Sequence, residues 1–227
     1  MKVSPPRSEA ELLERARAIA GLSMAELAAR LDAPIPAQAR RAKGWAGQLV
    51  ETALGATAGS RPEPDFQRLG IELKTIPVRP DGRPLESTYV CTVPLEAAEV
   101  GHWEAAYIRH KLARVLWVPL VGEAGGHPAE RRIGAALLWS PDPAEDAVLR
   151  ADWEELMEQV CLGRVDTLTA RHGTALQIRP KAADSHARRR GVGASGAPEA
   201  MLPRGFYLRA GFTATLLARR YALGGGQ

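Results

Sequence analysis

The first fifty residues of the chain carry apolar side chains at helical spacing. Apolar positions recur every three or four residues after Ser8 and after Ser23, and each serine is followed three residues later by a glutamate, as in a capping box. A third apolar stripe covers residues 45–54 and stops before Gly55. We therefore expect three helices. Segment 32–42 is too long and too rich in proline for the tight turn of a helix-turn-helix, which disfavours that class of DNA-binding motif.

Beyond Gly55 the period of the pattern changes from helix to strand. Residues 71–75 alternate between apolar or small and charged side chains, so Glu72 and Lys74 project from one face of a strand while the other face packs. Further strands are expected over residues 86–93 and 114–121, and the second is almost wholly apolar. An apolar strand of this kind is typical of the centre of a sheet.

The second half of the chain starts with a long amphipathic helix. It is expected over residues 143–162, with an apolar stripe that begins at Val148. A strand over residues 174–178 follows, and a short helix ends the chain. The run 182–199 is rich in Gly, Ala and Arg without apolar periodicity, which predicts a flexible loop that could order on DNA. The order of elements predicts an α/β (α+β) fold, with helices flanking a sheet.

Composition narrows the class of protein. A chain of 227 residues with 45% apolar content can bury a core of its own, and we expect one unit. No stretch reaches the roughly 18 uncharged apolar residues of a membrane span, and the N-terminus lacks the apolar core of a signal peptide, so we expect a soluble, cytoplasmic protein. The two cysteines and five histidines show no metal-ligand spacing, which disfavours a structural zinc site.

The charged residues point more specifically to chemistry. A net charge of +4 and a pI near 9.3 fit a polyanionic partner, although many proteins that never bind DNA share them. Only five of the 30 cationic residues are lysines. Arginine keeps its proton near neutral pH, whereas a desolvated lysine can lose it. Each internal lysine is therefore a candidate for chemistry, namely Lys43, Lys74, Lys111 and Lys181.

One constellation has the form of a nuclease site. Pro64-Asp65 is followed, after six residues, by Glu72-Leu73-Lys74. Two carboxylates can hold Mg²⁺ against a scissile phosphate, and Lys74 can orient or deprotonate the attacking water. An acidic-x-Lys triplet alone has odds of about one half of arising by chance in this composition and is usually a solvated strand face. The preceding Pro-Asp and the loop-to-strand context favour the nuclease site.

Several long stretches resemble, in order and over nearly the whole chain, the MutH family of mismatch-repair endonucleases. They include AKGWAGQLVETALGATAGSRPEPDFQRLGIELKTIPV, IRHKLARVLWVPL, ARHGTALQIRPKA and LPRGFYLRAGFTATLLARR. The resemblance implies the fold of type II restriction endonucleases, a mixed central sheet flanked by helices, with two arms around a DNA cleft. It also implies a monomer that nicks the unmethylated strand at hemimethylated GATC sites, activated by MutL, which MutS recruits.

The resemblance also assigns the catalytic residues. Asp65 and Glu72 match the metal ligands, for Mg²⁺ or another divalent cation such as Mn²⁺ or Ca²⁺, and Lys74 matches the catalytic lysine. Glu51 and Lys111 match accessory positions of the active site. Without the resemblance, Glu51 reads as an exposed helix carboxylate and Lys111 as a phosphate contact or a solvated charge. The single two-lobed domain is expected to divide into a catalytic arm, about 1–110, and a DNA-reading arm, about 111–227.

The resemblance assigns DNA contacts as well. They are Lys43, Gly44, Tyr89, Arg179, Pro180, Lys181 and Tyr207. Arg179, Pro180 and Lys181 match a loop that faces bases in the major groove, and Tyr207 matches the residue beside the methylatable adenine. Phe206 is assigned to the core. Tyr89 stands where Phe is expected in relatives, and the run Arg188–Arg190 has no counterpart in the resemblance.

Two other functions fit parts of this pattern. A restriction endonuclease that cuts both strands of GATC shares the catalytic domain, but it needs a second catalytic unit or a dimer, and the chain holds one Pro-Asp…Glu-x-Lys set. A non-catalytic DNA-binding module of the same fold is the other alternative. The intact Asp65, Glu72 and Lys74 argue against it, because a binder has no reason to hold carboxylates against phosphate.

Overall fold

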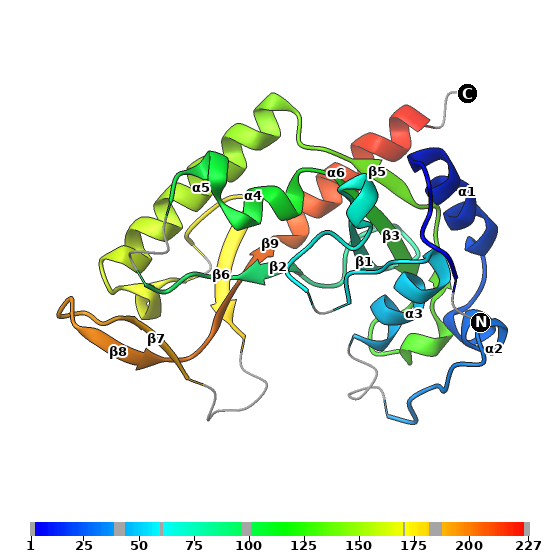
Figure 1. The fold of residues 1–227 in the computed structure, drawn as a ribbon, viewed down its shortest axis with the longest axis horizontal. Coiled ribbons are helices and arrows are strands. Elements are labelled where there is room, and N and C mark those ends of the chain that lie inside the picture. Colours follow the sequence, from blue (N-terminus) through cyan, green and yellow to red (C-terminus); the bar gives the residue numbers. More distant parts are fainter. Residues whose placement is uncertain are drawn as a thin grey trace. The chain divides into compact units, whose positions relative to one another are not determined.

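The computed structural model packs as two compact units that alternate along the chain. Unit 1 contains residues 1–86, 114–140 and 217–227, and unit 2 contains residues 87–113 and 141–216. The structure describes residues 3–38, 44–59, 61–96, 101–169, 171–181 and 188–224 (Figure 1). The catalytic and DNA-reading arms expected from the resemblance concern roles on DNA, and they stay a prediction.

Unit 1 is built around a mixed four-stranded sheet. Strand β1 (Glu72–Val78) runs parallel to β3 (Val115–Val121), while β4 (Arg132–Ile133) and β5 (Leu137–Trp139) pair antiparallel with β3. Strand β3 thus lies at the centre, as its apolar sequence predicts, and six of its seven residues are buried. The register places Glu72, at the start of β1, opposite Val115.

Three N-terminal helices of unit 1 confirm the predicted pattern: α1 (Glu9–Ile19), α2 (Met24–Arg30) and α3 (Trp45–Leu54). A complete capping box starts α2, whereas at α1 the serine hydroxyl accepts the backbone N–H of residue 11 without the reciprocal bond. Helix α3 ends at Gly55, with φ of 82°, where a Cβ would lie 2.4 Å from the carbonyl oxygen of Ser4. Only glycine fits there.

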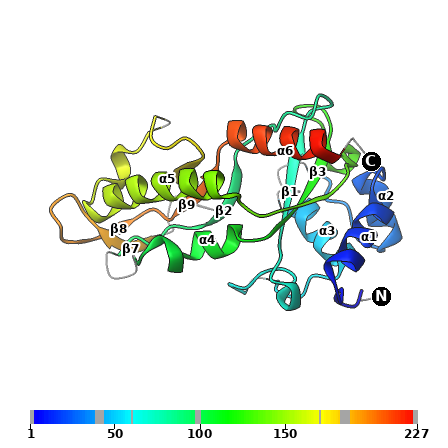
Figure 2. The ribbon, with the colours of Figure 1, turned by 90° about the horizontal axis from the view of Figure 1, so that it is seen from above.

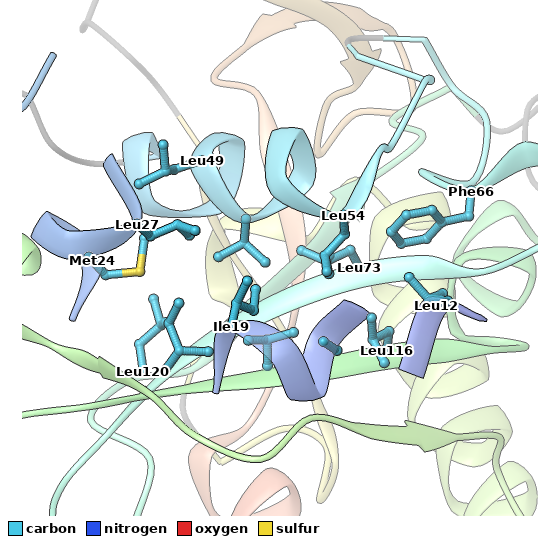
Figure 3. Packing of buried hydrophobic residues seen from close by; sticks show 14 of the residues in the cluster. Leu12, Ile19, Met24, Leu27, Leu49, Leu54, Phe66, Leu73, Leu116 and Leu120 are labelled. Carbon is cyan, nitrogen blue, oxygen red and sulfur yellow. The ribbon is translucent and has the colours of Figure 1, made fainter. Parts of the chain in front are cut away.

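The core of unit 1 lies between these helices and the sheet. It includes Leu12, Ile19, Met24, Leu27, Leu49, Leu54, Leu73, Leu116 and Leu120. Figure 3 shows their side chains between the helices and strands β1 and β3. Because truncating one such leucine to alanine costs about 2–5 kcal/mol, this packing fixes the position of β1, on which the candidate catalytic residues lie.

Unit 2 has a three-stranded antiparallel sheet in the order β2-β9-β6. The strands are β2 (Thr88–Thr92), β9 (Arg204–Leu208) and β6 (Leu176–Pro180). Helix α4 (Tyr107–Leu112) contacts β2 (Figure 2). Helix α5 (Pro143–Cys161), which opens with a capping box, contacts β6. The expected long helix is confirmed, but Val148 is exposed, so the apolar stripe begins one residue later, at the buried Leu149.

The expected loop 182–199 is wrong for its second part. Strands β7 (Arg189–Val192) and β8 (Pro198–Met201) form an antiparallel hairpin, while residues 182–187 lie outside the described residues. The sequence hides this hairpin because its two strands, RRGV and PEAM, do not alternate between apolar and polar residues. A Cβ on Gly191 would lie 2.7 Å from Met201 Sδ and 3.0 Å from Leu95 Cβ, so alternation gives way to close packing.

The last helix, α6 (Ala210–Gly224), has 15 residues and is longer than the short helix expected. Short elements such as α4, β4 and β5 were not predicted either. Among the described residues, no helix has the length and apolar character needed to cross a membrane. A mixed sheet combined with helices confirms the α/β class at the level of architecture.

Candidate functional site

The two carboxylates of the nuclease-like constellation are buried next to one strand. Asp65 is 8% exposed and Glu72 is 5% exposed. The backbone N–H of Leu73 donates to Asp65 Oδ2 at 2.7 Å. Asp65 therefore lies beside the residue that directly follows Glu72. The spacer folds back on itself, because Phe66 and Ile71 exchange backbone hydrogen bonds and Gly70 between them has φ of 65°. This turn brings together two residues that are seven positions apart.

Lys74 joins the carboxylates from the same face of β1. Its Nζ donates to Glu72 Oε1 at 2.8 Å, and the two side chains are only 14% and 7% exposed. The expectation that both side chains share a face is met, but that face is not a solvated one. Water screens a buried ion pair little, so each charge strongly affects the other.

The donor set fits a hard divalent cation. Among the described residues, no group of three or more His, Cys, Asp or Glu side chains could hold a metal ion, so the protein offers the two carboxylates Asp65 and Glu72. Mg²⁺ is commonly bound by one or two carboxylates together with water and substrate phosphate. Structural zinc, in contrast, takes four Cys or His ligands. The residues present therefore suit Mg²⁺ better than zinc.

Glu51 lies on α3 near β1. A Cβ added to Gly47, one turn earlier, would lie 3.9 Å from Glu51 Oε1 and 3.6 Å from Thr75 Oγ1. The carboxylate of Glu51 and the hydroxyl of Thr75, the residue after Lys74, thus both lie close to Gly47. Glu51 is half-buried, so its interpretation as an exposed helix carboxylate is wrong.

Lys111 belongs to unit 2, on helix α4. It is 9% exposed, and its Nζ lies 5.7 Å from the centre of the Tyr107 ring. Burial excludes the interpretation as a solvated charge. A buried ammonium beside an aromatic face is costly to desolvate, and an accessory role in the active site stays a prediction.

Two tyrosines and two cations gather on the sheet of unit 2. Tyr89 on β2 stands opposite Tyr207 on β9, with ring centres 5.4 Å apart and edge-to-face. The Arg179 guanidinium lies 5.6 Å from the Tyr207 ring, and Lys181 Nζ lies 3.6 Å from the Tyr89 ring and donates to its hydroxyl. We call Tyr89, Arg179, Lys181 and Tyr207 the recognition cluster. Both cations are exposed, so the recognition cluster faces solvent.

Burial raises the pKa of Tyr89 well above its ordinary value, so its hydroxyl stays protonated. Pro180 ends β6, and the backbone N–H of Lys181 donates to the carbonyl of Pro203 at 2.7 Å. This bond fixes the point at which the chain leaves the sheet. Pro180 and the flanking Arg179 and Lys181 are therefore presented from an anchored strand end.

Gly205 was missed by sequence reasoning, yet the recognition cluster requires it. A Cβ at this position would lie 2.9 Å from Tyr89 Cε2 and 3.1 Å from Tyr207 Cε2. The rings can therefore pack over β9 only when residue 205 has no side chain. The signal in the sequence is a glycine inside a strand, which often marks a close approach.

Gly44 precedes α3 in a left-handed conformation, with φ of 87°. Its carbonyl accepts the backbone N–H of Gln48, so the residue forms the turn that starts the helix. It is exposed. Lys43, its partner in the expected DNA-contacting turn, lies outside the described residues.

Asp152, a buried carboxylate in α5 of unit 2, was also missed. It is 5% exposed. Its oxygens accept the backbone N–H groups of Thr174, Ala175 and Leu176 at 2.5 to 2.9 Å. Arg209 completes the anchor by donating from its side chain to the carbonyl of His172 at 2.5 Å. Together these bonds fasten the start of β6, the strand that carries Arg179.

A buried carboxylate before strand β1, together with a second carboxylate and a lysine on that strand, has the arrangement of a metal-dependent nuclease of the Pro-Asp…Glu-x-Lys class. A family model described as "DNA mismatch repair enzyme MutH" matches residues 54–152. The DNA mismatch repair protein MutH of Klebsiella pneumoniae is 55% identical over 97% of this chain and 95% of its own length. The MutH protein of Yersinia pestis is 53% identical over 97% of this chain and 96% of its own.

The chain belongs to the MutH family of DNA mismatch repair enzymes. Enzymes of this family are endonucleases that nick the unmethylated strand at hemimethylated GATC sites, and membership implies the fold of type II restriction endonucleases. The sequence-based interpretation as a mismatch-repair endonuclease is thereby confirmed. Membership in the MutH family excludes the two alternatives, the restriction enzyme and the non-catalytic DNA-binding module.

Proposed function

We propose that Asp65, Glu72 and Lys74 form the nicking centre of this endonuclease. The observation that carries the proposal is the buried Lys74–Glu72 ion pair at 2.8 Å, beside a second buried carboxylate that is held by the backbone of Leu73. Burying two acids and a lysine together costs free energy. A site that binds a cation and a phosphate explains why such an arrangement would be kept.

Asp65 and Glu72 are the residues that would hold Mg²⁺, or Mn²⁺ or Ca²⁺ in its place. When bound, the ion polarises the phosphate and lowers the pKa of a coordinated water. Lys74 orients the attacking water. As a neutral amine its Nζ accepts the proton of that water, and as an ammonium it offsets negative charge on the phosphate oxygens. Glu51 supports this site from α3, and Lys111 keeps the accessory role that the family resemblance implies.

The recognition cluster would read GATC in the major groove. Arg179 and Lys181 are suited to the O6 and N7 acceptors of guanine. Tyr207, packed against Tyr89 in the space that Gly205 leaves open, would lie beside adenine N6 on the strand to be cut. A methyl group at N6 replaces a donor hydrogen with apolar bulk, so a methylated strand would clash. Pro180 would restrict the backbone between Arg179 and Lys181, and Lys43 and Gly44 would add further contacts with DNA.

The protein would act as a monomer on double-stranded DNA. One nicking centre cuts one strand, and an asymmetric contact at Tyr207 selects which strand that is. MutL, recruited by MutS, would activate it. Nicking of supercoiled plasmid with Mg²⁺, on unmethylated, hemimethylated and fully methylated DNA with and without MutL, tests the proposal. Nicking that ignores methylation, or that persists in EDTA, would contradict it.

The role of Tyr207 has its own experiment. Tyr207→Ser removes the ring, so the preference for unmethylated over methylated strands should fall about 5- to 150-fold, corresponding to about 1–3 kcal/mol of discrimination. Tyr207→Phe keeps the ring and serves as the matched control, which should retain the preference. The measurement is the ratio of nicking rates on the two duplexes. An unchanged ratio in Tyr207→Ser would move methyl sensing elsewhere, with residues 179–181, at the end of β6, the next candidates.

A further inference from the structure

The β7–β8 hairpin carries a run of three arginines that the proposed reaction does not use. Arg188, Arg189 and Arg190 are all exposed. Successive side chains of a strand point to opposite faces, so three exposed neighbours place positive charge on both faces of this ribbon. Across the ladder, Arg189 and Arg190 face Met201 and Ala200, which carry no charge.

Strand β7 is bonded to the segment that follows β2, in the sheet that carries the recognition cluster. The backbone N–H of Val192, at the turn end of the hairpin, donates to the carbonyl of Leu95, and the N–H of Val93, two residues before Leu95, donates to the carbonyl of Arg204 on β9. The positive charge of Arg189 also acts on Tyr89, where it opposes the increase in pKa that burial causes. The arginine run and the recognition cluster therefore lie in one neighbourhood of unit 2.

The reach of the chain limits how far apart these groups can be. Lys181 and Arg188 are seven residues apart, so their Cα atoms are at most about 25 Å from one another. A GATC site is about 14 Å long, at about 3.4 Å per base pair. Arginines within about 25 Å of Lys181 can thus contact DNA phosphates outside the four base pairs of the GATC site.

We propose that Arg188, Arg189 and Arg190 form a clamp for DNA phosphates that flank the GATC site. The inference rests on the proposed function, which brings double-stranded DNA to the recognition cluster. Guanidinium groups stay charged and match phosphate oxygens with paired donors. In β7 and β8, Glu199 is the other charged side chain and lies opposite Gly191, so the three arginines leave the hairpin with a net positive charge. It adds affinity that is independent of sequence.

The test is the salt dependence of binding to a 30-base-pair duplex with one central GATC, measured in EDTA so that no strand is cut. The variant is R188Q/R189Q/R190Q in the full chain. Each lost phosphate contact lowers the slope of log K against log salt by about 0.9, so a loss of up to about 2.7 is expected. On a duplex trimmed to three base pairs on either side of GATC, the difference from the unchanged protein should shrink. The preference for GATC over a scrambled site should persist.

Two further variants separate charge at this hairpin from charge in general and from folding. R17Q/R30Q/R150Q removes three exposed arginines elsewhere, and its slope should change less than that of the hairpin variant. R188K/R189K/R190K keeps the charge and should keep most of the slope. If the glutamine variant melts at a lower temperature, the lysine variant still tests the role of the charge. A slope that falls equally in both variants would overturn the proposal.

Failure of this inference differs from failure of the proposed function. If the unchanged protein prefers GATC but R188Q/R189Q/R190Q has the same slope, the phosphate clamp is wrong and the nicking centre is untouched. If the slope is unchanged while activation by MutL is lost, the arginines bind an acidic protein surface, which also overturns the clamp. If the unchanged protein has no preference for GATC, the proposed function fails first.

Discussion

Unit 1 and unit 2 each bury carboxylates to a similar extent and bond them differently. Asp65 and Glu72 are 8% and 5% exposed, and Asp152 is 5% exposed. Glu72 takes the ammonium of Lys74, a side chain that can move, and Asp65 accepts the backbone N–H of Leu73. Asp152, in contrast, takes three consecutive backbone N–H groups. Burial alone does not separate Glu72 from Asp152, but the kind of partner does.

A side-chain partner can be displaced by a cation or a phosphate without unfolding a strand. Backbone donors offer no such freedom, because residues 174–176 cannot leave Asp152 unless the start of β6 comes away from α5. We infer that Asp152 is an anchor and that Glu72 is available for catalysis, while the bond from the backbone of Leu73 places Asp65 beside Glu72. The predictions below test this contrast.

The largest effect is expected in unit 1. Asp65→Ala, Glu72→Ala and Lys74→Ala should each reduce nicking to background, a loss of at least about 10²- to 10⁴-fold for the proton-handling group alone. DNA binding and melting temperature should largely persist. Glu63→Ala, which removes an exposed acid from the same loop, is the matched control and should nick normally. Nicking at the unchanged rate in any of the three variants would remove that residue from the site.

Lys74→Arg should be nearly as inactive as Lys74→Ala. The charge is kept, but a guanidinium is bulkier and cannot act as a base near neutral pH. Single-turnover nicking rates at saturating protein measure this. Substantial activity would mean that Lys74 supplies charge and orientation, and that the proton leaves by another route.

Asp152 should show the reverse behaviour. Asp152→Ala leaves three backbone donors without their acceptor, at about 1–3 kcal/mol for each donor that finds no water, so the melting temperature should fall markedly. Asp152→Asn keeps one acceptor and should fall less. The nicking that remains at low temperature should need the metal as before. Full stability together with lost nicking in Asp152→Ala would reverse the contrast between the two units.

Glu9 offers the smallest effect, from an exposed carboxylate. Hydrogen bonds from Arg114 lower its pKa, so the stabilisation is present above the unfolded pKa of about 4.3 and is lost as pH falls through the folded value. Glu9→Gln should cost less than about 1 kcal/mol at pH 7, because water screens the pair. Urea unfolding at pH 7 and pH 3 measures this, and a cost that persists at pH 3 would exclude the ion pair as its source.

Local signals explain what could be predicted from the sequence. The capping box of Ser23, the apolar run of β3 and the stop at Gly55 each act within a few residues, and each lies in the structure where expected. The Pro-Asp…Glu-x-Lys spacing is also local, because its spacer closes through a single turn between Phe66 and Ile71.

Contacts across long stretches of chain could not be predicted. Lys181 meets Tyr89 from 92 positions away, and Asp152 binds backbone 22 to 24 residues further along. The burial of Glu72 was also missed, because alternation assigns it to a face but cannot say that other elements cover that face. The β7–β8 hairpin escaped because Gly191 packs where an alternating pattern would need a side chain.

The alternation of the two units along the chain has a consequence for how the protein folds. Glu72 pairs in register with Val115, 43 residues later, and Thr88, inside that interval, pairs with Leu208, 120 residues later. Neither ladder can start as a local hairpin, and closing such long loops precedes any gain from the contacts. We therefore expect slow folding, during which β2 stays an exposed, unpaired strand and a target for proteolysis or aggregation until β9 reaches it.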